Sequence, residues 1–371
     1  MFIELHMIQN FAPANLNRDD TNNPKDCEFG GVRRARISSQ CLKRAIRLSP
    51  IFAQTTSADV GTRTKWIIRL LREHLTAAGK PEAEADAILP AFVTGYISKL
   101  DKDGARTAVL LYLSKTEIAD LVQALLDNWA ALLDEETRAK TVEQMTKVLV
   151  KAQKGQTSAP DIALFGRMLA EHPELNLEAA CQVAHAISTH RVTMEMDFYT
   201  AVDDLNPEDT TGAGMMGFIG FDSACFYRYA RIDWDQLVKN LRDDTGLAAR
   251  TVEGFLRAAV AALPTGKQNT FAAHNPPSFL LAVVRQDGMG WSLVNAFETP
   301  TKPNPSGGLV APSVAAMDVY WGRLCQVYGT ATLVRLAALA VDADLSLEHL
   351  KAAQVEGMQA WVSAVVETLP V

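Results

Sequence analysis

A short segment near the start of the chain concentrates side chains that bind phosphate. Between Gly31 and Ser49 the sequence has six basic residues and no acid, although the whole chain carries a formal net charge of −7. A solvated charged face usually alternates its signs, whereas like charges at this density repel one another unless a polyanion binds them. Local clusters of cations predict phosphate contacts better than global charge does. This segment, the basic strip, therefore predicts nucleic-acid binding; its cations are Arg33, Arg34, Arg36, Lys43, Arg44 and Arg47.

A helix is predicted to begin inside the basic strip. Ser38 is suited to an N-cap, and Ile37 and Leu42 are spaced as a hydrophobic staple around it. Lys43 and Arg47 then project from one face of the helix, one turn apart. The unpaired backbone N–H groups at a helix start favour anions, so this region is predicted to hold phosphates.

Carboxylates precede the basic strip in a polar loop. Asp19, Asp20 and Asp26 lie there, and a nuclease can use such a loop acid with a metal ion. No histidine and no second acidic pair at ligand spacing accompany them in the loop. Turn-forming residues are therefore the preferred interpretation.

A glycine pattern later in the chain matches G-x-G-x-x-G through Gly212, Gly214 and Gly217. In a dinucleotide site these glycines follow a buried strand and open a helix. Here an acidic, polar loop precedes them and a strand-like run follows. A flexible hairpin or extended arm is predicted instead of a nucleotide site.

Signatures of catalysis or metal binding are missing from the sequence. It has no G-x-S-x-G elbow, Walker loop or H-E-x-x-H motif, and its five cysteines form no C-x-x-C pair. Cys181, His185 and His190 lie close in sequence, but buried structural roles are favoured over zinc ligation. The sequence thus predicts no enzymatic activity, no metal and no cofactor.

The elements that must position these residues follow a mixed order. Residues 3–11 alternate as a half-buried strand, a turn-rich loop covers 13–31, and residues 61–153 are almost wholly helical, like an insertion. Strands are also predicted at 162–165, 221–232, 270–273 and 279–285, with helices at 177–188 and in the C-terminal segment. Strands mixed irregularly with helices indicate an α+β fold.

Composition places the chain among ordinary globular proteins. Of its 371 residues, 48% are hydrophobic, but no apolar run approaches the roughly 20 residues that span a bilayer. Residues 1–10 lack the features of a signal peptide. We therefore expect a cytoplasmic protein without a membrane partner.

A set of segments in chain order resembles the CasC family, the repeated backbone subunit of the type I-E CRISPR surveillance complex Cascade. The N-terminal matches are LNRDD at 16–20, FGGVRRARISSQ at 29–40 and LKRA at 42–45. Later matches are DIAL at 161–164, GRM at 166–168, AHAI at 184–187, TH at 189–190, TAVDDL at 200–205, FYRYA at 226–230 and NAFE at 295–298.

The resemblance implies a hand-like α+β fold with an RRM-like, ferredoxin-like palm, helical fingers and a glycine-rich thumb hairpin. The implied divisions are palm and basic helix at 1–58, fingers at 59–158, palm at 159–192, thumb at 193–220, and palm with C-terminal helices at 221–371. The thumb explains the glycine-rich arm over 205–220.

The resemblance also implies a function. Copies of such a subunit stack as a filament along a crRNA guide, each thumb displacing a base, and the guide pairs with target DNA. The implied partners are the guide, target DNA through it, further copies and other Cascade subunits. The implied RNA-binding residues are Arg18, Lys25, Ser38, Gln40, Lys43, Arg47, Arg167, Met168, Phe198, Tyr199 and Thr200. Lys43 and Arg47, with Ser38 and Gln40, are expected to face RNA, whereas Arg33, Arg34 and Arg36 support the loop or a neighbouring subunit.

Two other interpretations stay open from the sequence. Related backbone subunits of type III complexes cut target RNA with a loop aspartate, so a metal-dependent ribonuclease using Asp26 is the main alternative. The other is a metabolic helical-bundle protein in which the basic strip is incidental.

Overall fold

The computed structural model describes residues 1–371 except 97, 170–171, 202–203 and 205–214. It divides into two compact units. The first comprises residues 1–52, 182–232 and 252–370, and the second comprises 53–181 and 233–251 together with residue 371. The helical insertion predicted at 59–158 lies within the second unit, which also takes in 159–181 and 233–251.

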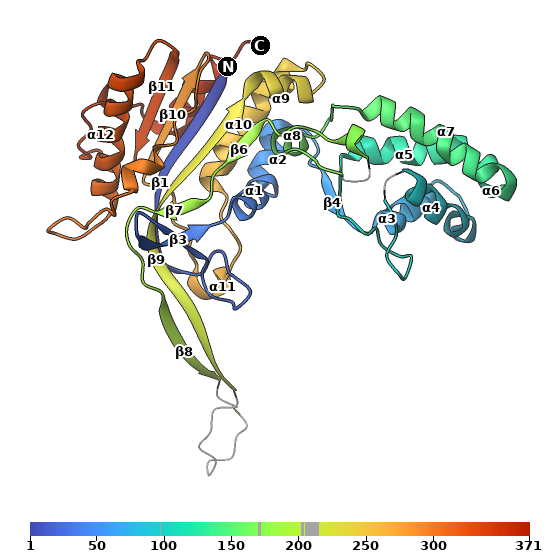
Figure 1. Ribbon diagram of the computed structural model, residues 1–371, viewed down its shortest axis with the longest axis horizontal. Coiled ribbons are helices and arrows are strands. Elements are labelled where there is room, and N and C mark those ends of the chain that lie inside the picture. Colours follow the sequence, from blue (N-terminus) through green and yellow to red (C-terminus); the bar gives the residue numbers. More distant parts are fainter. Residues whose placement is uncertain (97, 170–171, 202–203, 205–214) are drawn as a thin grey trace. The chain divides into compact units, whose positions relative to one another are not determined.

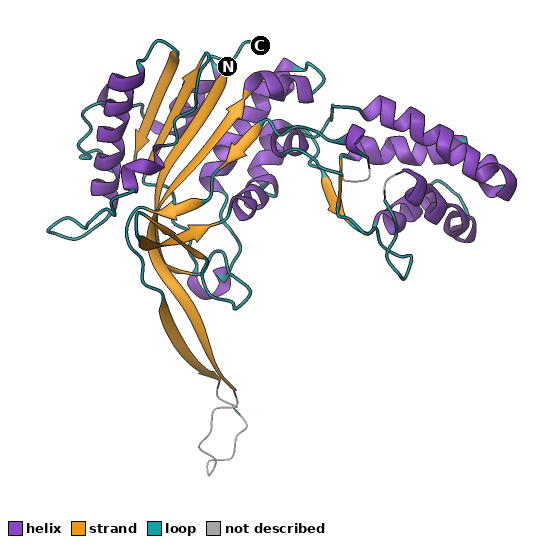
Figure 2. Cartoon of the chain, viewed as in Figure 1, coloured by secondary structure: helices purple, strands orange, loops and turns teal. Residues whose placement is uncertain are grey.

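The first unit is built on a sheet with the strand order β11-β10-β1-β9-β7-β3-β2, to which β6 and β8 add by pairing with β9 (Figures 1 and 2). Its strands are β1 (Phe2–Ala14), β2 (Asp26–Phe29), β3 (Val32–Ile37), β6 (Cys181–Val183), β7 (Ala186–Ser188), β8 (Glu195–Ala201), β9 (Met215–Asp233), β10 (Phe279–Arg285) and β11 (Leu333–Ala340). Together with the helices, this sheet confirms the predicted α+β class.

Helices α12 (Val310–Tyr328) and α13 (Gly357–Val366) pack on this sheet. Alternate side chains of β10 share a core with α12, whereas Trp361 of α13 donates from Nε1 to the carbonyl of Ala337 on β11 at 3.0 Å. All seven residues of β10 are buried. Smaller elements complete the unit: α1 (Ser39–Arg47), α11 (Gln268–Phe271), η2 (Leu293–Phe297) and η3 (Lys351–Ala353), while α2 (Pro50–Thr56) and α10 (Thr245–Ala261) span the boundary between the units.

The first strand is longer and more deeply buried than predicted. The half-buried prediction for residues 3–11 was wrong, because Glu4 and His6 on the polar side of the alternation are fully buried. Glu4 pairs with Arg285 at 2.7 Å, and His6 Nδ1 bonds the Tyr227 hydroxyl at 2.8 Å. Burial lowers the pKa of His6 to about 4. A polar network thus replaces the expected solvent.

The second unit is mainly helical, as predicted for residues 61–153. An apolar core joins its helices, with Leu121, Leu125, Trp129 and Leu132 buried as their spacing indicated. A two-stranded β4–β5 sheet interrupts the helices. The elements are β4 (Thr62–Thr64), α3 (Ile67–Ala77), α4 (Glu82–Tyr96), β5 (Leu111–Leu113), α5 (Lys115–Asp127), α6 (Trp129–Leu133), α7 (Glu135–Gln153), α8 (Pro160–Phe165), η1 (Pro173–Leu175) and α9 (Trp234–Asn240).

Three short predictions were wrong. Residues 162–165 are helical in α8, because Pro160 at its first turn and Asp161 beside it favour a helix start. Residues 177–188 contain the strands β6 and β7, which are set by pairing with β9. Residues 270–273 fall on the helical turn α11 and its end. The strand predicted at 279–285 is confirmed as β10, and the one at 221–232 lies within β9.

No helix in the described part of the chain is both long and apolar enough to cross a membrane.

Candidate nucleic-acid interface

The basic strip forms a β-hairpin followed by a helix. Strands β2 and β3 are antiparallel, and Gly30 and Gly31 at their turn have φ angles of 60° and 70°. A Cβ at Gly30 would also collide with the carbonyl oxygen of Glu298, so glycine is required there. Helix α1 begins as predicted, with Ser38 Oγ accepting a bond from Cys41 N at 3.4 Å. The strip therefore has a fixed backbone.

The polar loop before β2 is tied to this hairpin. Asp19 Oδ1 accepts bonds from the backbone N–H groups of Thr21 and Asn23, both at 2.9 Å, and from the Thr21 hydroxyl. These bonds, led by that of Thr21, lower the pKa of Asp19. Lys25 N donates to the Asn17 carbonyl at 2.8 Å, which positions the lysine beside β3. Asp19 is thus a turn-forming residue, as the sequence indicated.

Arg34 serves the interior of the fold. Its guanidinium donates to the backbone carbonyls of Phe29, Ser188, Phe297 and Glu298 at 2.7–3.2 Å. The residue is fully buried, and burial lowers its pKa. Arg34 therefore supports the loop and does not contact a ligand at the surface.

Arg33 and Arg36, on either side of Arg34 in β3, also bond to Asp26 of β2. Arg33 forms an ion pair with Asp26 at 3.1 Å. Arg36 donates from Nε to the Asp26 carbonyl and from a terminal nitrogen to His185 Nδ1, both at 3.1 Å. Burial, with Arg36 and Lys25 nearby, lowers the pKa of His185. Arg36 and His185 are both at least partly exposed, so they remain at the surface as a fixed pair.

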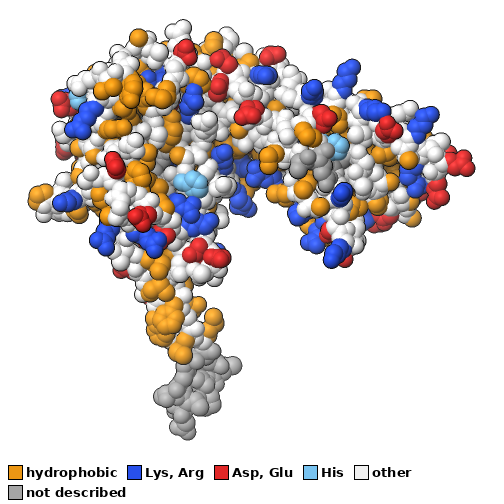
Figure 3. All heavy atoms as spheres, viewed as in Figure 1, with side chains coloured by type: hydrophobic (Ala, Val, Ile, Leu, Met, Phe, Trp, Pro, Cys, Tyr) orange, Lys and Arg blue, Asp and Glu red, His pale blue; other side chains and the backbone are white. Residues whose placement is uncertain are grey.

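The helix presents a different set of side chains. Gln40 and Arg44 are exposed and Lys43 is partly exposed, whereas Ser38 and Arg47 are each only 7% exposed. Lys and Arg side chains gather on the surface around β3 (Figure 3). Two of the predicted RNA-binding residues on this helix, Lys43 and Gln40, thus lie at the surface. In the preceding loop, Arg18 is exposed and Lys25 is partly exposed. Arg47, which was also predicted to contact RNA, has a largely buried side chain.

A long antiparallel hairpin of β8 and β9 carries the residues predicted for the thumb. Residues facing each other across the ladder share one side of the hairpin. Phe198 faces Phe218 with ring centroids 5.2 Å apart, and Thr200 faces Met216. Tyr199 lies on the opposite side, where its ring covers Gly217. The structure therefore separates Tyr199 from Phe198 and Thr200.

The side that carries Phe198 is an exposed apolar surface. Phe198 is 52% exposed, Phe218 69% and Met216 68%, with Met196 beside them at 54%. On the face drawn in Figure 3, hydrophobic side chains occur along the described part of the hairpin. We call this surface, made of Met196, Phe198, Met216 and Phe218, the hairpin face. Of these four residues only Phe198 was predicted from the sequence, and the alternation of the other three in an aromatic strand was the only signal for them.

Residues 205–214 of the glycine-rich arm, with Gly212 and Gly214 of the rejected nucleotide motif, lie outside the described residues. Gly217 lies inside strand β9, not at the start of a helix.

Arg167 and Met168 belong to the second unit and have different environments. Arg167 forms a buried ion pair with Glu117 at 2.6 Å and donates to the carbonyls of Leu175 and Tyr112. Met168 is 85% exposed. The arginine therefore anchors the segment that presents the methionine, and only Met168 is placed at the surface.

The residues considered for metal binding have other partners. Asp26 holds Arg33 and His185 holds Arg36, and His190 Nε2 accepts a bond from Cys225 N at 3.1 Å. Among the described residues no three His, Cys, Asp or Glu side chains come together as metal ligands. Asp222, on β9, has its pKa raised to about 7 by burial and by the nearby Asp26 carboxylate.

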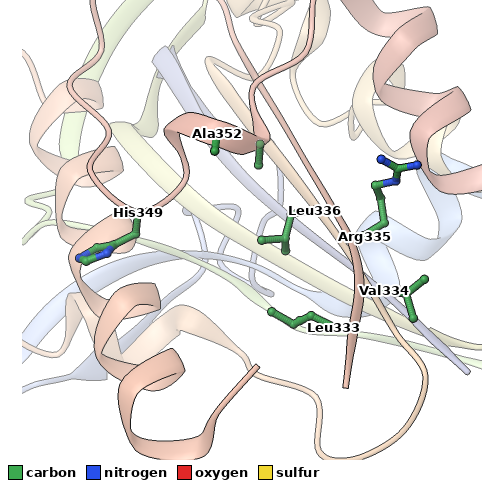
Figure 4. Close-up of a pocket in the computed structure, with 7 residues that line it drawn as sticks. Leu333, Val334, Arg335, Leu336, His349 and Ala352 are labelled. Carbon is green, nitrogen blue, oxygen red and sulfur yellow. The ribbon is translucent and has the colours of Figure 1, made fainter. Parts of the chain in front are cut away.

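A separate hollow of about 360 Å³ lies beside strand β11 (Figure 4). Residues of β11 line it together with His349, namely Leu333, Val334, Arg335 and Leu336. None of the predicted site residues borders it.

Comparison with known proteins gives consistent matches along the whole chain. The family model described as CT1975-like protein (Cas_CT1975) matches residues 3–367. A solved chain titled "CRISPR RNA-guided surveillance complex, pre-nicking" is 31% identical, with a TM-score of 0.87 over 100% of both chains. A second, titled "CRISPR RNA-guided surveillance complex", is 26% identical, with a TM-score of 0.76 over 99% of both chains. A search of curated proteins found no match.

Proposed function

We propose, from the premise that this chain belongs to the CT1975-like family of Cas proteins, that it is the non-catalytic crRNA-binding backbone subunit of a type I-E Cascade complex. Its likeness to subunits of CRISPR surveillance complexes supports a Cascade-type role. In this proposal the first unit is an RRM-like palm with the β8–β9 hairpin as thumb, and the helices of the second unit are the fingers.

The observation that carries the proposal is the exposed hairpin face in the same unit as the basic strip. Four large apolar side chains that are each more than half exposed have no core beneath them among the described residues. Such surfaces on soluble proteins usually mark a binding site. Aromatic side chains stack on bases of any sequence, and cations beside them hold the phosphates. Together they suit a single strand whose sequence varies.

Sequence tolerance fits the role of a guide-holding scaffold. A subunit that accepts every guide must bind phosphate and ribose through groups such as Lys43, Arg18 and Lys25, leaving base edges available. Base pairing between guide and target DNA then supplies specificity. The partners in this proposal are the crRNA, target DNA through the guide, further copies of the chain and other Cascade subunits, in the cytoplasm.

The proposal that the chain is not an enzyme has its own support. Asp26, the loop carboxylate of the ribonuclease alternative, is engaged by Arg33 at 3.1 Å. Incubating the assembled complex with complementary RNA and Mg²⁺ should leave the RNA intact. Cleavage that the Asp26→Ala variant abolishes would establish the ribonuclease instead.

Filament formation on RNA tests the scaffold function. The purified chain, mixed with single-stranded RNAs of increasing length, should form particles whose mass rises in equal steps of one subunit. Two RNAs of equal length and unrelated sequence should give the same masses. Particles of constant mass, or assembly on only one of the sequences, would contradict the proposal.

A further inference from the structure

The base of the β8–β9 hairpin packs closely against the polar loop of residues 16–24. A Cβ added to Gly220, on β9, would lie 2.5 Å from Asn23 Oδ1 and 3.3 Å from Pro24 Cδ. The sulfur of Met194, which lies just before β8, would be 3.1 Å from the same Cβ. The loop that carries Arg18 and leads into Lys25 and the hairpin that carries Phe198 therefore meet at one point.

Asn15 bonds both partners at this point. Its side-chain nitrogen Nδ2 donates to the carbonyl of Asn22 in the loop at 3.0 Å and to the carbonyl of Gly220 in the hairpin at 2.8 Å. The residue is fully buried, and its Oδ1 has no hydrogen-bond partner among the described residues. A buried acceptor without a partner is unfavourable. The two hydrogen bonds that Nδ2 donates therefore hold the amide in place.

A segment with strained backbone conformations, residues 264–272, packs against this junction. A Cβ at Gly266 would collide with the carbonyl oxygens of Leu16 and Asn15, so Gly266 packs directly against the backbone where the loop begins. Phe271 in the same segment contacts Phe221 of the hairpin, with ring centroids 5.8 Å apart. The helical turn α11 is flanked by Lys267 and Ala272 with φ angles of 49° and 46°. Such conformations persist only where surrounding contacts enforce them.

We propose that Asn15 is a positioning residue that locks the β8–β9 hairpin onto the 16–24 loop, so that the hairpin face and the cations of the loop meet one RNA strand at a fixed spacing. This inference rests on the proposed function for its consequence, but the lock itself is a property of the protein without RNA. Asn15 acts through Gly220 and Asn22 and does not touch the RNA.

A distance measurement tests the lock in the absence of RNA. Spin labels are introduced through non-canonical amino acids at Asp20 in the loop and Asp197 on the exposed β8, because the chain has partly exposed cysteines of its own. Asn15→Asp keeps the size of the side chain and removes both donors. The parent should give one narrow distance distribution, and Asn15→Asp should lose that single peak.

Asn240 supplies a matched control. It is also buried and also bridges two backbone carbonyls through Nδ2, those of Ala163 at 2.9 Å and Glu178 at 2.8 Å, within the second unit. Asn240→Asp should keep the narrow distribution. An unchanged distribution in Asn15→Asp, or equal broadening in both variants, would overturn the proposal. Asn15→Ser, which keeps one donor, replaces Asn15→Asp if the latter does not fold, and should broaden the distribution less.

RNA binding then separates positioning from general destabilisation. Asn15→Asp should lower RNA affinity. The loss should not exceed the contribution of one base stacked on an aromatic side chain, which is about five- to 150-fold. In a Phe198→Ala/Phe218→Ala background the same substitution should cause no further loss. An additive loss would refute action through the hairpin. Absence of RNA binding by the parent would instead refute the proposed function, while the spin-label result still decides the lock.

Discussion

Lys43→Ala should reduce the salt dependence of RNA binding by one phosphate contact. Lys43 lies on α1 with its side chain partly exposed, beside the exposed Arg44. Each cation that neutralises a phosphate of a single strand contributes about −0.7 to the slope of log K against log salt concentration. The slope therefore counts the cations that the folded protein presents to RNA.

Four cations lie at the surface of α1 and of the preceding loop: Lys43 and Arg44 on the helix, and Arg18 and Lys25 before it. If each of them neutralises one phosphate, one subunit gives a slope of about −2.8. Lys43→Ala should bring it to about −2.1 and, if both lines meet at 1 M salt, weaken binding about fivefold at 0.1 M.

The assay is fluorescence anisotropy of a labelled, unstructured RNA titrated with protein at several KCl concentrations. Arg69→Ala is the matched control: it removes the same charge from an exposed residue of α3 that pairs with Glu73 at 2.8 Å. Its slope should equal that of the parent. An unchanged slope in Lys43→Ala, or an equal change in Arg69→Ala, would refute the assignment of this surface.

Three further perturbations have defined outcomes. Phe218→Ala should weaken RNA binding as much as Phe198→Ala, each by about 1–3 kcal/mol, and an effect in only one would refute a shared stacking surface. Asp222 has its pKa raised from 3.8 to about 7 in the folded state, so its contribution to stability is present below pH 4 and lost as pH rises through 7. Asp222→Asn should therefore raise the urea midpoint at pH 8 relative to the parent but not at pH 4, and an equal gain at both would contradict this. Arg285→Met, which leaves the buried Glu4 carboxylate without its 2.7 Å partner, should cost about 3–5 kcal/mol in the free energy of unfolding, measured by urea denaturation, whereas a loss below about 1 kcal/mol would show that the pair is not desolvated.

Local signals in the sequence were sufficient where they acted over a few residues. Ser38 caps α1 because its side chain and the next turn are adjacent in the chain. The helices of residues 61–153 follow their apolar spacing. Strand β10 is apolar from Phe279 to Val284 and is buried along its whole length, as such a run indicates.

Tertiary contacts decided the elements that the sequence did not reveal. The alternation around Glu4 and His6 indicated a solvent-facing side, but Arg285 and Tyr227, more than 200 residues away, bury both. The strands at 181–188 depend on pairing with β9 and carry no pattern of their own. Propensity is a weak guide in such places because long-range pairing overrides it.

The candidate site shows the same division. The cluster of cations was evident from composition, but which of them reach the surface was not, because the burial of Arg34 depends on carbonyls at 188, 297 and 298. Phe218 and Met216 join Phe198 only through the register of β8 and β9. That register requires the folded hairpin, so the hairpin face could not be assembled from the sequence alone.

The RNA content of the native assembly tests the central claim most directly. The chain is expressed with its genomic neighbours, the assembly is purified through a tag on another subunit, and its absorbance is measured at 260 and 280 nm before and after ribonuclease treatment. RNA binding by a backbone subunit predicts the absorbance ratio of a nucleoprotein and a retained RNA of defined length. An assembly that contains this chain in several copies yet shows the ratio of protein alone would contradict the claim.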